Sequence, residues 1–299
     1  MKLCWFSAVE DYSTVQETRN MDKKAQLPIG MFDSGVGGLT VLKALKERLP
    51  CEDVIYLGDT ARLPYGTKSP QTVSRYAVQC AAELVNRGIK LLVVACNTAS
   101  AVAIEPLRQA YPDIPVIGVV EPGAQAACNA SKNHAIAVIA TEATISGGAY
   151  QRAIHALDPQ ARIIGHPCPL FVALAEEGWT EGDVPEAVAT RYLDPVFRPA
   201  SGTAHPVIPD TLVLGCTHFP LLAPAIRNVL TAGTVIVDSA ATTAETVHTQ
   251  LRNLGMNRPD DGCGTTRYLT TDDAARFART GTRFLGTPIV EHEVELVDL

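Results

Sequence analysis

Short apolar runs alternate with amphipathic helical patterns along most of the chain, starting near residue 28. Apolar runs such as LLVVA and TLVLG suit strands that are buried on both faces, as in parallel sheets covered by helices. Alternation of strands and helices is typical of a doubly wound α/β fold. The pattern predicts helices near 36–48, 70–87 and 98–110, and strands near 28–33, 53–58, 90–95, 115–119, 135–140, 161–164, 211–215 and 234–237.

Two segments of the chain repeat the same plan. KLLVVACNTASAVAIEPLRQAYPDIPVIGV, from Lys90, and DTLVLGCTHFPLLAPAIRNVLTAGTVIVD, from Asp210, each read as a strand, a cysteine, a polar pair, a helix and a second strand. A fainter echo links IGMFDSGVGG with AVIATEATIS. Because open sheets bind ligands at the carboxyl ends of their strands, two such halves facing each other would place Cys96 and Cys216 in one cleft. The alternative is that two strands end in cysteine by coincidence.

Composition narrows the class of protein. The chain has 299 residues and a formal charge of −7, and no basic run suggests nucleic-acid binding. No apolar run approaches the roughly 20 residues of a membrane span, and the N-terminus lacks the features of a secretory signal. We therefore expect a cytoplasmic protein with no nucleic-acid or membrane partner. Its eight cysteines are scattered without a CxxC pair, so most are expected to be inert.

Cys96 ends a predicted strand and opens a predicted helix. The partial positive charge of a helix N-terminus lowers a thiol pKa from about 8.5 towards neutrality, so we expect a reactive thiol here. Asn97 and Thr98 add donors suited to a carboxylate. The alternative is a packed cysteine followed by a helix-capping pair.

Cys216 occupies the equivalent place in the second unit, followed by Thr217 and His218. The imidazole of His218 could exchange a proton with the thiol or stabilise the thiolate, unless it only caps its own helix.

Asp33 begins the glycine-rich turn DSGVGG, which fits neither GxGxxG nor a P-loop. It is a candidate partner for a cysteine or an ammonium group, and the alternative is a tight turn. LPYGTKS, at 63–69, is either a lid or carboxylate-binding loop or an ordinary surface loop.

Two like groups suit the inversion of a stereocentre. One base must remove a proton from one face of the carbon and an acid must return one to the other face. A thiolate and a thiol form such a pair. The two groups exchange the roles of base and acid when the mirror-image substrate reacts. Donors around the α-carboxylate would stabilise the carbanionic transition state, and we expect them to come from Ser34, Asn97, Thr98 and Thr217.

The motifs DSGVGGLTV, LPYGTKS, ACNTAS, CPLFVALAEEG and LGCTHFPLL, in this order between Ile29 and Asp238, closely resemble those of bacterial glutamate racemase. DSGVGG with PYGTKS is specific to that family, whereas CNT and CTH are shared with aspartate and hydantoin racemases. The resemblance implies interconversion of L- and D-glutamate, without a cofactor or metal, to supply D-glutamate for peptidoglycan. It implies two catalytic cysteines, Cys96 and Cys216, assisted by Asp33 and His218 respectively. The implied substrate-binding residues are Asp33, Ser34, Tyr65, Gly66, Asn97, Thr98, Thr217 and His218.

The resemblance also implies two pseudo-symmetric doubly wound domains with the active site in the cleft between them. The first would comprise 28–120 and 240–299, the second 121–239, and residues 1–27 would form an N-terminal extension. The alternation in EHEVELVDL suggests an edge strand or a tail docked on the first domain. The extension resembles that of enzymes activated by a cell-wall precursor nucleotide, which makes such a nucleotide a candidate activator. A monomer and a homodimer both remain open.

Three rival interpretations remain. His166 and Cys168 could join Cys216 and His218 in a Cys2His2 zinc site, although their spacing is unusual for one. The same architecture could serve a non-catalytic ligand-binding protein, because fold does not fix function. Aspartate could replace glutamate as the substrate. The PYGTKS loop favours glutamate.

Overall fold

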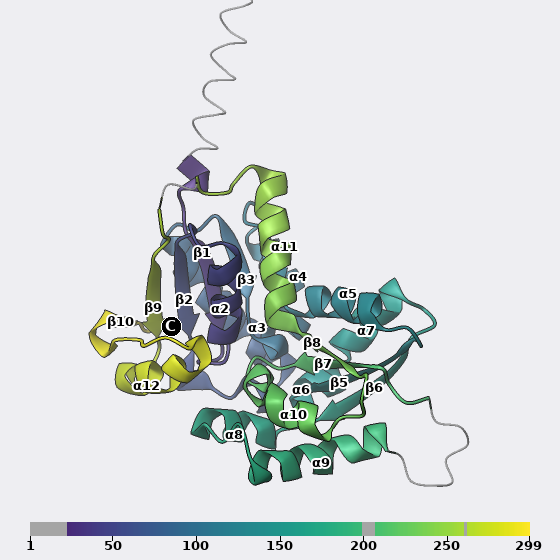
Figure 1. Ribbon diagram of the computed structural model, residues 1–299. Helices are drawn as coiled ribbons and strands as arrows, with labels where there is room; N and C mark the ends of the chain where they lie inside the picture. Colours follow the sequence, from purple (N-terminus) through teal and green to yellow (C-terminus); the bar gives the residue numbers. More distant parts are fainter. Residues whose placement is uncertain (1–22, 199–206, 260–261) are drawn as a thin grey trace, which may run out of the picture.

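The chain folds around two parallel β-sheets in a computed structural model, which describes residues 23–198, 207–259 and 262–299 (Figure 1). Most of the predicted N-terminal extension, residues 1–22, lies outside the described residues. The first sheet has the strand order β10-β9-β2-β1-β3-β4 and the second has the order β6-β5-β7-β8. Every strand pair in both sheets is parallel, which confirms the predicted α/β class.

The strands of the first sheet are β1 (Ile29–Asp33), β2 (Val54–Gly58), β3 (Leu91–Val94), β4 (Val116–Gly118), β9 (Thr266–Thr270) and β10 (Val294–Leu296). Those of the second are β5 (Ala135–Ala140), β6 (Arg162–Pro167), β7 (Thr211–Gly215) and β8 (Val235–Asp238). The inner strands β1, β2, β3, β5 and β7 are buried throughout. The edge strands β6 and β8 are partly exposed, because one side of each has no partner strand.

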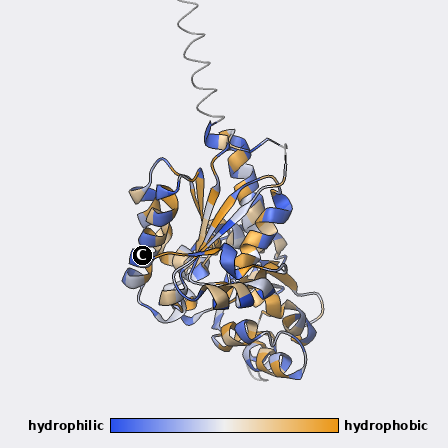
Figure 2. Cartoon of the chain, turned by 90° about the vertical axis from the view of Figure 1, so that its left-hand side faces the viewer, coloured by the Kyte–Doolittle hydropathy of each residue, from blue (hydrophilic) through white to orange (hydrophobic). Residues whose placement is uncertain are grey.

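Helices connect the strands and cover the sheets. The α-helices are α2 (Leu39–Arg48), α3 (Pro70–Asn86), α4 (Asn97–Ala110), α5 (Val120–Ala130), α6 (Glu142–Gly147), α7 (Ala149–Leu157), α8 (Leu170–Glu177), α9 (Asp183–Phe197), α10 (Ala223–Val229), α11 (Ser239–Leu254) and α12 (Ala274–Leu285). Short 3₁₀ helices are η1 (Thr60–Arg62), η2 (Tyr65–Thr67), η3 (Phe219–Leu222) and η4 (Glu291–Glu293). Hydrophobic residues predominate in the strands, whereas the helices mix hydrophobic and hydrophilic residues (Figure 2). Such a mixture is typical of helices that cover a sheet with one face.

The two sheets share one strand plan. Within the first sheet the order β4-β3-β1-β2 matches the order β8-β7-β5-β6 of the second, so β3 corresponds to β7 and β1 to β5. Both sequence echoes therefore fall on equivalent strands. One apolar core cluster contains residues from both sheets, and two further clusters lie on one sheet each. The shared cluster joins the two halves of the molecule.

The C-terminal region completes the first sheet. β10 pairs in parallel with β9 at the edge of the sheet, so EHEVELVDL contains the predicted edge strand. β9, which the apolar pattern did not reveal, pairs with β2. α11 packs against α2 of the first half and α5 of the second. The exact domain limits at 120 and 240 stay a prediction.

Candidate active site

A cavity of about 290 Å³ lies at the carboxyl ends of strands from both sheets. Cys96 follows β3 and Cys216 follows β7, and both line this cavity. The repeated strand plan therefore brings the two thiols together, as the sequence echo predicts. The other lining residues are Ser34, Leu63, Pro64, Tyr65, Gly66, Thr67, Asn97, Thr98, Thr141, Glu142, Pro169, Val172, Ala173, Glu176 and Thr217.

Cys96 caps the N-terminus of α4 and is 5% exposed. Its Sγ lies 3.7 Å from the Ser34 hydroxyl. Burial, together with the negative charge of Asp33, raises the pKa of Cys96 to about 12. The sequence-based expectation of a lowered pKa is wrong, because the cost of burying a thiolate exceeds the stabilisation from the backbone N–H groups at the helix start. Cys96 is therefore held as a thiol.

Asp33 ends β1 and is fully buried behind the cavity. Its Oδ2 accepts a hydrogen bond from the backbone N–H of Gly35 at 3.0 Å. Burial raises the pKa of Asp33, and the charge of His218 and nearby backbone N–H groups offset part of this effect. Asp33 does not line the cavity. Its electrostatic contacts with Cys96 and His218 instead connect the two sides of the site.

His218 links Cys216 to an acidic residue. Its Nδ1 lies 3.9 Å from Cys216 Sγ and 3.5 Å from Thr217 Oγ1, and its Nε2 lies 3.2 Å from Glu176 Oε1. Burial lowers the pKa of His218, but hydrogen bonds to Cys216 and Glu176 outweigh it and raise the pKa to about 10. The imidazole is thus held as a cation beside Cys216. The ring of Phe284 packs edge-on against it, 5.0 Å between centroids.

Asn97 and Thr98 begin α4 and contact residues of the second half. Asn97 Nδ2 donates a hydrogen bond to the hydroxyl of Tyr150 at 2.8 Å. Thr98 Oγ1 lies 3.1 Å from Thr141 Oγ1 and 3.2 Å from Thr144 Oγ1. These contacts place an amide and a group of hydroxyls at one end of the cavity, where an anionic group could bind.

The loop at 63–69 lies over the cavity, and its residues from Leu63 to Thr67 line it. The hydroxyl of Tyr65 donates to Asp59, so it does not face a ligand. A Cβ at Gly66 would lie 2.9 Å from Cβ of Thr141, so only glycine allows the loop to pack this closely. The Tyr65 hydroxyl is therefore engaged within the protein, and contacts from this loop to a ligand would come from its other lining atoms. The roles predicted for Tyr65 and Gly66 stay predictions.

Several functional candidates were not singled out from the sequence. Glu176, Thr141 and Tyr150 all contact predicted site residues. A signal for Glu176 is present in CPLFVALAEEG, because Pro169, Val172, Ala173 and Glu176 recur at helical spacing and all line the cavity. Thr141 and Tyr150 depend on tertiary packing and carry no comparable signal.

The zinc interpretation finds no support. Among residues 23–198, 207–259 and 262–299, no group of three or more His, Cys, Asp or Glu side chains is arranged to hold a metal ion.

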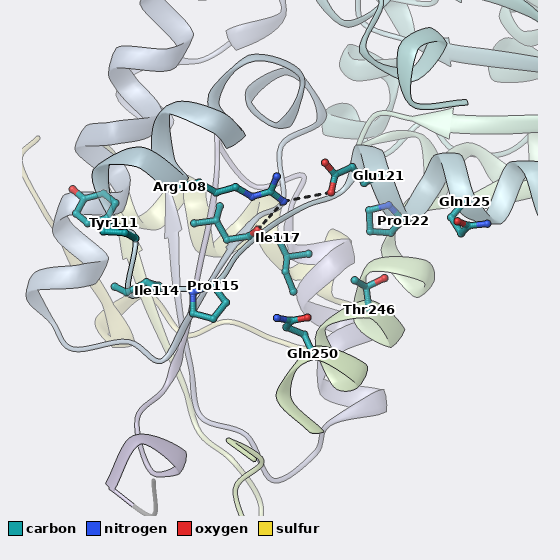
Figure 3. A pocket seen from close by; sticks show the side chains of 12 residues that line it. Arg108, Tyr111, Ile114, Pro115, Ile117, Glu121, Pro122, Gln125, Thr246 and Gln250 are labelled. Carbon is teal, nitrogen blue, oxygen red and sulfur yellow. Dashed lines mark hydrogen bonds and ion pairs between the residues drawn. The ribbon is translucent and has the colours of Figure 1, made fainter. Parts of the chain in front are cut away.

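Helices in the described part of the chain are all too short or too polar to cross a membrane. A second cavity of about 560 Å³ lies beside the edge strand β4, lined by residues including Arg108, Tyr111 and Gln250 (Figure 3). It contains none of the predicted site residues.

Comparison with known proteins agrees with the geometry. The family model for Asp/Glu/Hydantoin racemases matches residues 34–247. The chain belongs to this family. It is 51% identical to a glutamate racemase of Geobacter metallireducens over 86% of its own length and 92% of the relative. Within the racemase family the chain is therefore an isomerase of the glutamate racemase group.

Solved structures of glutamate racemases share the fold of this racemase. One from Francisella tularensis, in complex with D-glutamate, superposes with a TM-score of 0.82 at 35% identity, covering 92% of this chain and 98% of the other. One from Escherichia coli, in complex with L-glutamate and the activator UDP-MurNAc-ala, gives 0.69 at 31% identity, covering 86% and 95%. Both similarities extend over most of each chain.

Proposed function

We propose that the chain interconverts L- and D-glutamate by a two-base mechanism in which Cys96 and Cys216 act on opposite faces of the α-carbon. The observation that carries this proposal is the position of both cysteines on one cavity, at equivalent strand ends of two sheets with the same order. The names of the similar racemases supply glutamate as the substrate.

The two cysteines have different neighbours: Cys96 lies close to Ser34 and Asp33, and Cys216 lies beside His218. Cys216 lies 3.9 Å from Nδ1 of the cationic His218, and we assign it the role of the base for one enantiomer. Cys96 is held as a thiol and is the acid. Cys216 removes the α-proton from one enantiomer, and the S–H bond of Cys96 breaks as its proton reaches the other face. For the opposite enantiomer the roles are exchanged: Cys96 is the base and Cys216 is the acid.

The carbanionic transition state needs donors that are already in place. Ser34, Asn97, Thr98 and Thr217 line the cavity and can donate hydrogen bonds to the α-carboxylate. Thr98 and Thr217 are 5% exposed and Asn97 3%, so their dipoles act with little screening by water. We assign substrate binding to these residues, with Gly66 and Tyr65 contributing from the overlying loop.

Cys96→Ser and Cys216→Ser test the mechanism. Each variant loses one acid/base group, so racemisation should fall by about 100- to 10,000-fold in both directions. Circular dichroism of L- and D-glutamate solutions measures the rate directly. Cys128→Ser is a matched control, because this half-buried cysteine lies in α5 away from the cavity. Near-normal racemisation by either cavity variant would overturn the two-base proposal, and aspartate assayed in parallel tests the alternative substrate.

The product defines the biological role that we propose. D-Glutamate is a component of peptidoglycan, so we place this activity in cell-wall precursor synthesis in the cytoplasm. The Escherichia coli structure contains UDP-MurNAc-ala as an activator. We propose a nucleotide of this class as an activator here as well. Assays with and without UDP-MurNAc-ala test this: an unchanged rate at saturating nucleotide would contradict it.

A further inference from the structure

Tyr150 is a buried tyrosine that bridges the two halves directly behind the cavity. It lies in α7 and is 1% exposed. Its hydroxyl accepts the hydrogen bond from Asn97 Nδ2 at 2.8 Å, and Asn97 directly follows Cys96. Ser239, the first residue of α11, lies near the same hydroxyl and influences its pKa. One side chain of the second half thus contacts the active-site amide and lies near the start of the connecting helix.

Tyr150 packs so close to Gly123 and Gly215 that a side chain at either glycine would crowd it. A Cβ at Gly215 would lie 3.1 Å from the Tyr150 ring, and a Cβ at Gly123 would lie 3.1 Å from its hydroxyl. Gly215 is the residue that precedes Cys216. Tyr150 is therefore hydrogen-bonded to the residue that follows Cys96 and lies close to the residue that precedes Cys216.

The Asn97 side chain is only partly satisfied. Its Nδ2 is bonded to Tyr150, whereas its Oδ1 is buried and has no hydrogen-bond partner among the described residues. A buried amide oxygen without a partner is costly, and a residue that lines the cavity can regain that bond from a ligand. Burial raises the pKa of Tyr150, so its hydroxyl stays neutral and does not exchange protons in the reaction.

We propose that Tyr150 is a positioning residue for glutamate: its hydroxyl fixes the orientation of the Asn97 carboxamide, which then contacts the substrate. Tyr150 acts through Asn97 and touches neither the substrate nor the reacting atoms. Without the hydroxyl, the carboxamide can rotate, and part of the substrate-binding energy is spent on ordering it. The effect belongs to binding and not to proton transfer.

A double-mutant cycle tests this inference. Tyr150→Phe should raise KM for both enantiomers by about three- to tenfold, the equivalent of one net hydrogen bond, with a smaller change in kcat. In an Asn97→Ala background, Tyr150→Phe should have no further effect on KM, because the group through which it acts is gone. Calorimetric Kd values for D-glutamate replace KM for any variant too slow to assay.

Tyr268→Phe is the matched control, since Tyr268 is a buried tyrosine of β9 that does not line the cavity. A wild-type KM for Tyr150→Phe would overturn the proposal. Multiplying effects in the double variant would also overturn it, because they would show that Tyr150 and Asn97 act independently. Neither result bears on the cysteines, which their own variants test.

Discussion

His218 is surrounded by groups that favour its protonated form. The carboxylate of Glu176 lies on one side of the ring, Cys216 on the other, and Asp33 contributes a further negative charge. These groups raise the pKa of His218 from 6.5 to about 10 in the folded protein. The positive charge is therefore a property of the site across the neutral range.

The stability conferred by His218 should depend on pH. A raised pKa in the folded state stabilises the protein fully below the unfolded value of 6.5, and this contribution disappears as pH rises to about 10. We expect the difference in Tm between the wild type and His218→Asn to be largest near pH 6 and to shrink steadily towards pH 10. Thermal denaturation at several pH values measures it.

Glu176→Gln is the companion variant. Removal of the carboxylate should lower the pKa of His218, so the contribution of His218 should disappear at a lower pH than in the wild type. A Tm difference between the wild type and His218→Asn that is the same at every pH would contradict the assignment of a charged imidazole.

At the scale of elements, the glycine-rich turn between β1 and α2 brings the two halves into contact. Thr40 Oγ1 lies 3.0 Å from the backbone oxygens of both Gly37 and Thr217. A Cβ at Gly37 would lie 2.4 Å from Thr217 Oγ1 and 2.5 Å from His218 Nδ1. The absence of a side chain at Gly37 therefore allows the CTH segment to approach.

Gly37→Ala should displace Thr217 and His218 from their positions. Because misplacement of site residues by about 1 Å can reduce turnover about 100-fold, we expect a loss of that order in kcat with the fold retained. Gly147→Ala is the matched control, since no atom lies within 4 Å of a Cβ there and alanine favours the helix. Steady-state kinetics and circular dichroism distinguish the two. Normal kcat in Gly37→Ala would show that the close contact is dispensable.

Elements with a strong apolar pattern were predictable from the sequence. β5 and β7 match the predicted ranges 135–140 and 211–215, because their residues are buried throughout. α2 begins at Leu39, later than the predicted residue 36, because Gly37 and Gly38 remain in the turn. β9, with the sequence TRYLT, has only part of its length buried and gave no apolar run to detect.

The site was predictable to the extent that it follows strand ends. Cys96 and Cys216 could be placed together because both follow strands of a repeated unit. The raised pKa of Cys96 could not be predicted, because it depends on burial and on Asp33, which is distant in sequence. The same holds for Tyr150, whose contact with Asn97 exists only after the two halves pack.

At the scale of the whole molecule, the proposed mechanism rests on the repeated strand plan. Two sheets with the same strand order present equivalent strand ends to one cavity, and each contributes one thiol. The shared apolar core holds these ends in register. A near-symmetric pair of bases is what a reaction with two mirror-image substrates requires.

The central claim is that different groups handle the proton on the two faces of one carbon. The most direct test is to incubate one enantiomer of glutamate with the enzyme in deuterium oxide and analyse both enantiomers at early times by mass spectrometry. We predict that the inverted product carries deuterium from its first appearance, because its α-hydrogen comes from a solvent-exchanged thiol, while the remaining substrate stays unlabelled. An inverted product that retains the protium of the substrate would contradict the account, because a single group would then have served both faces.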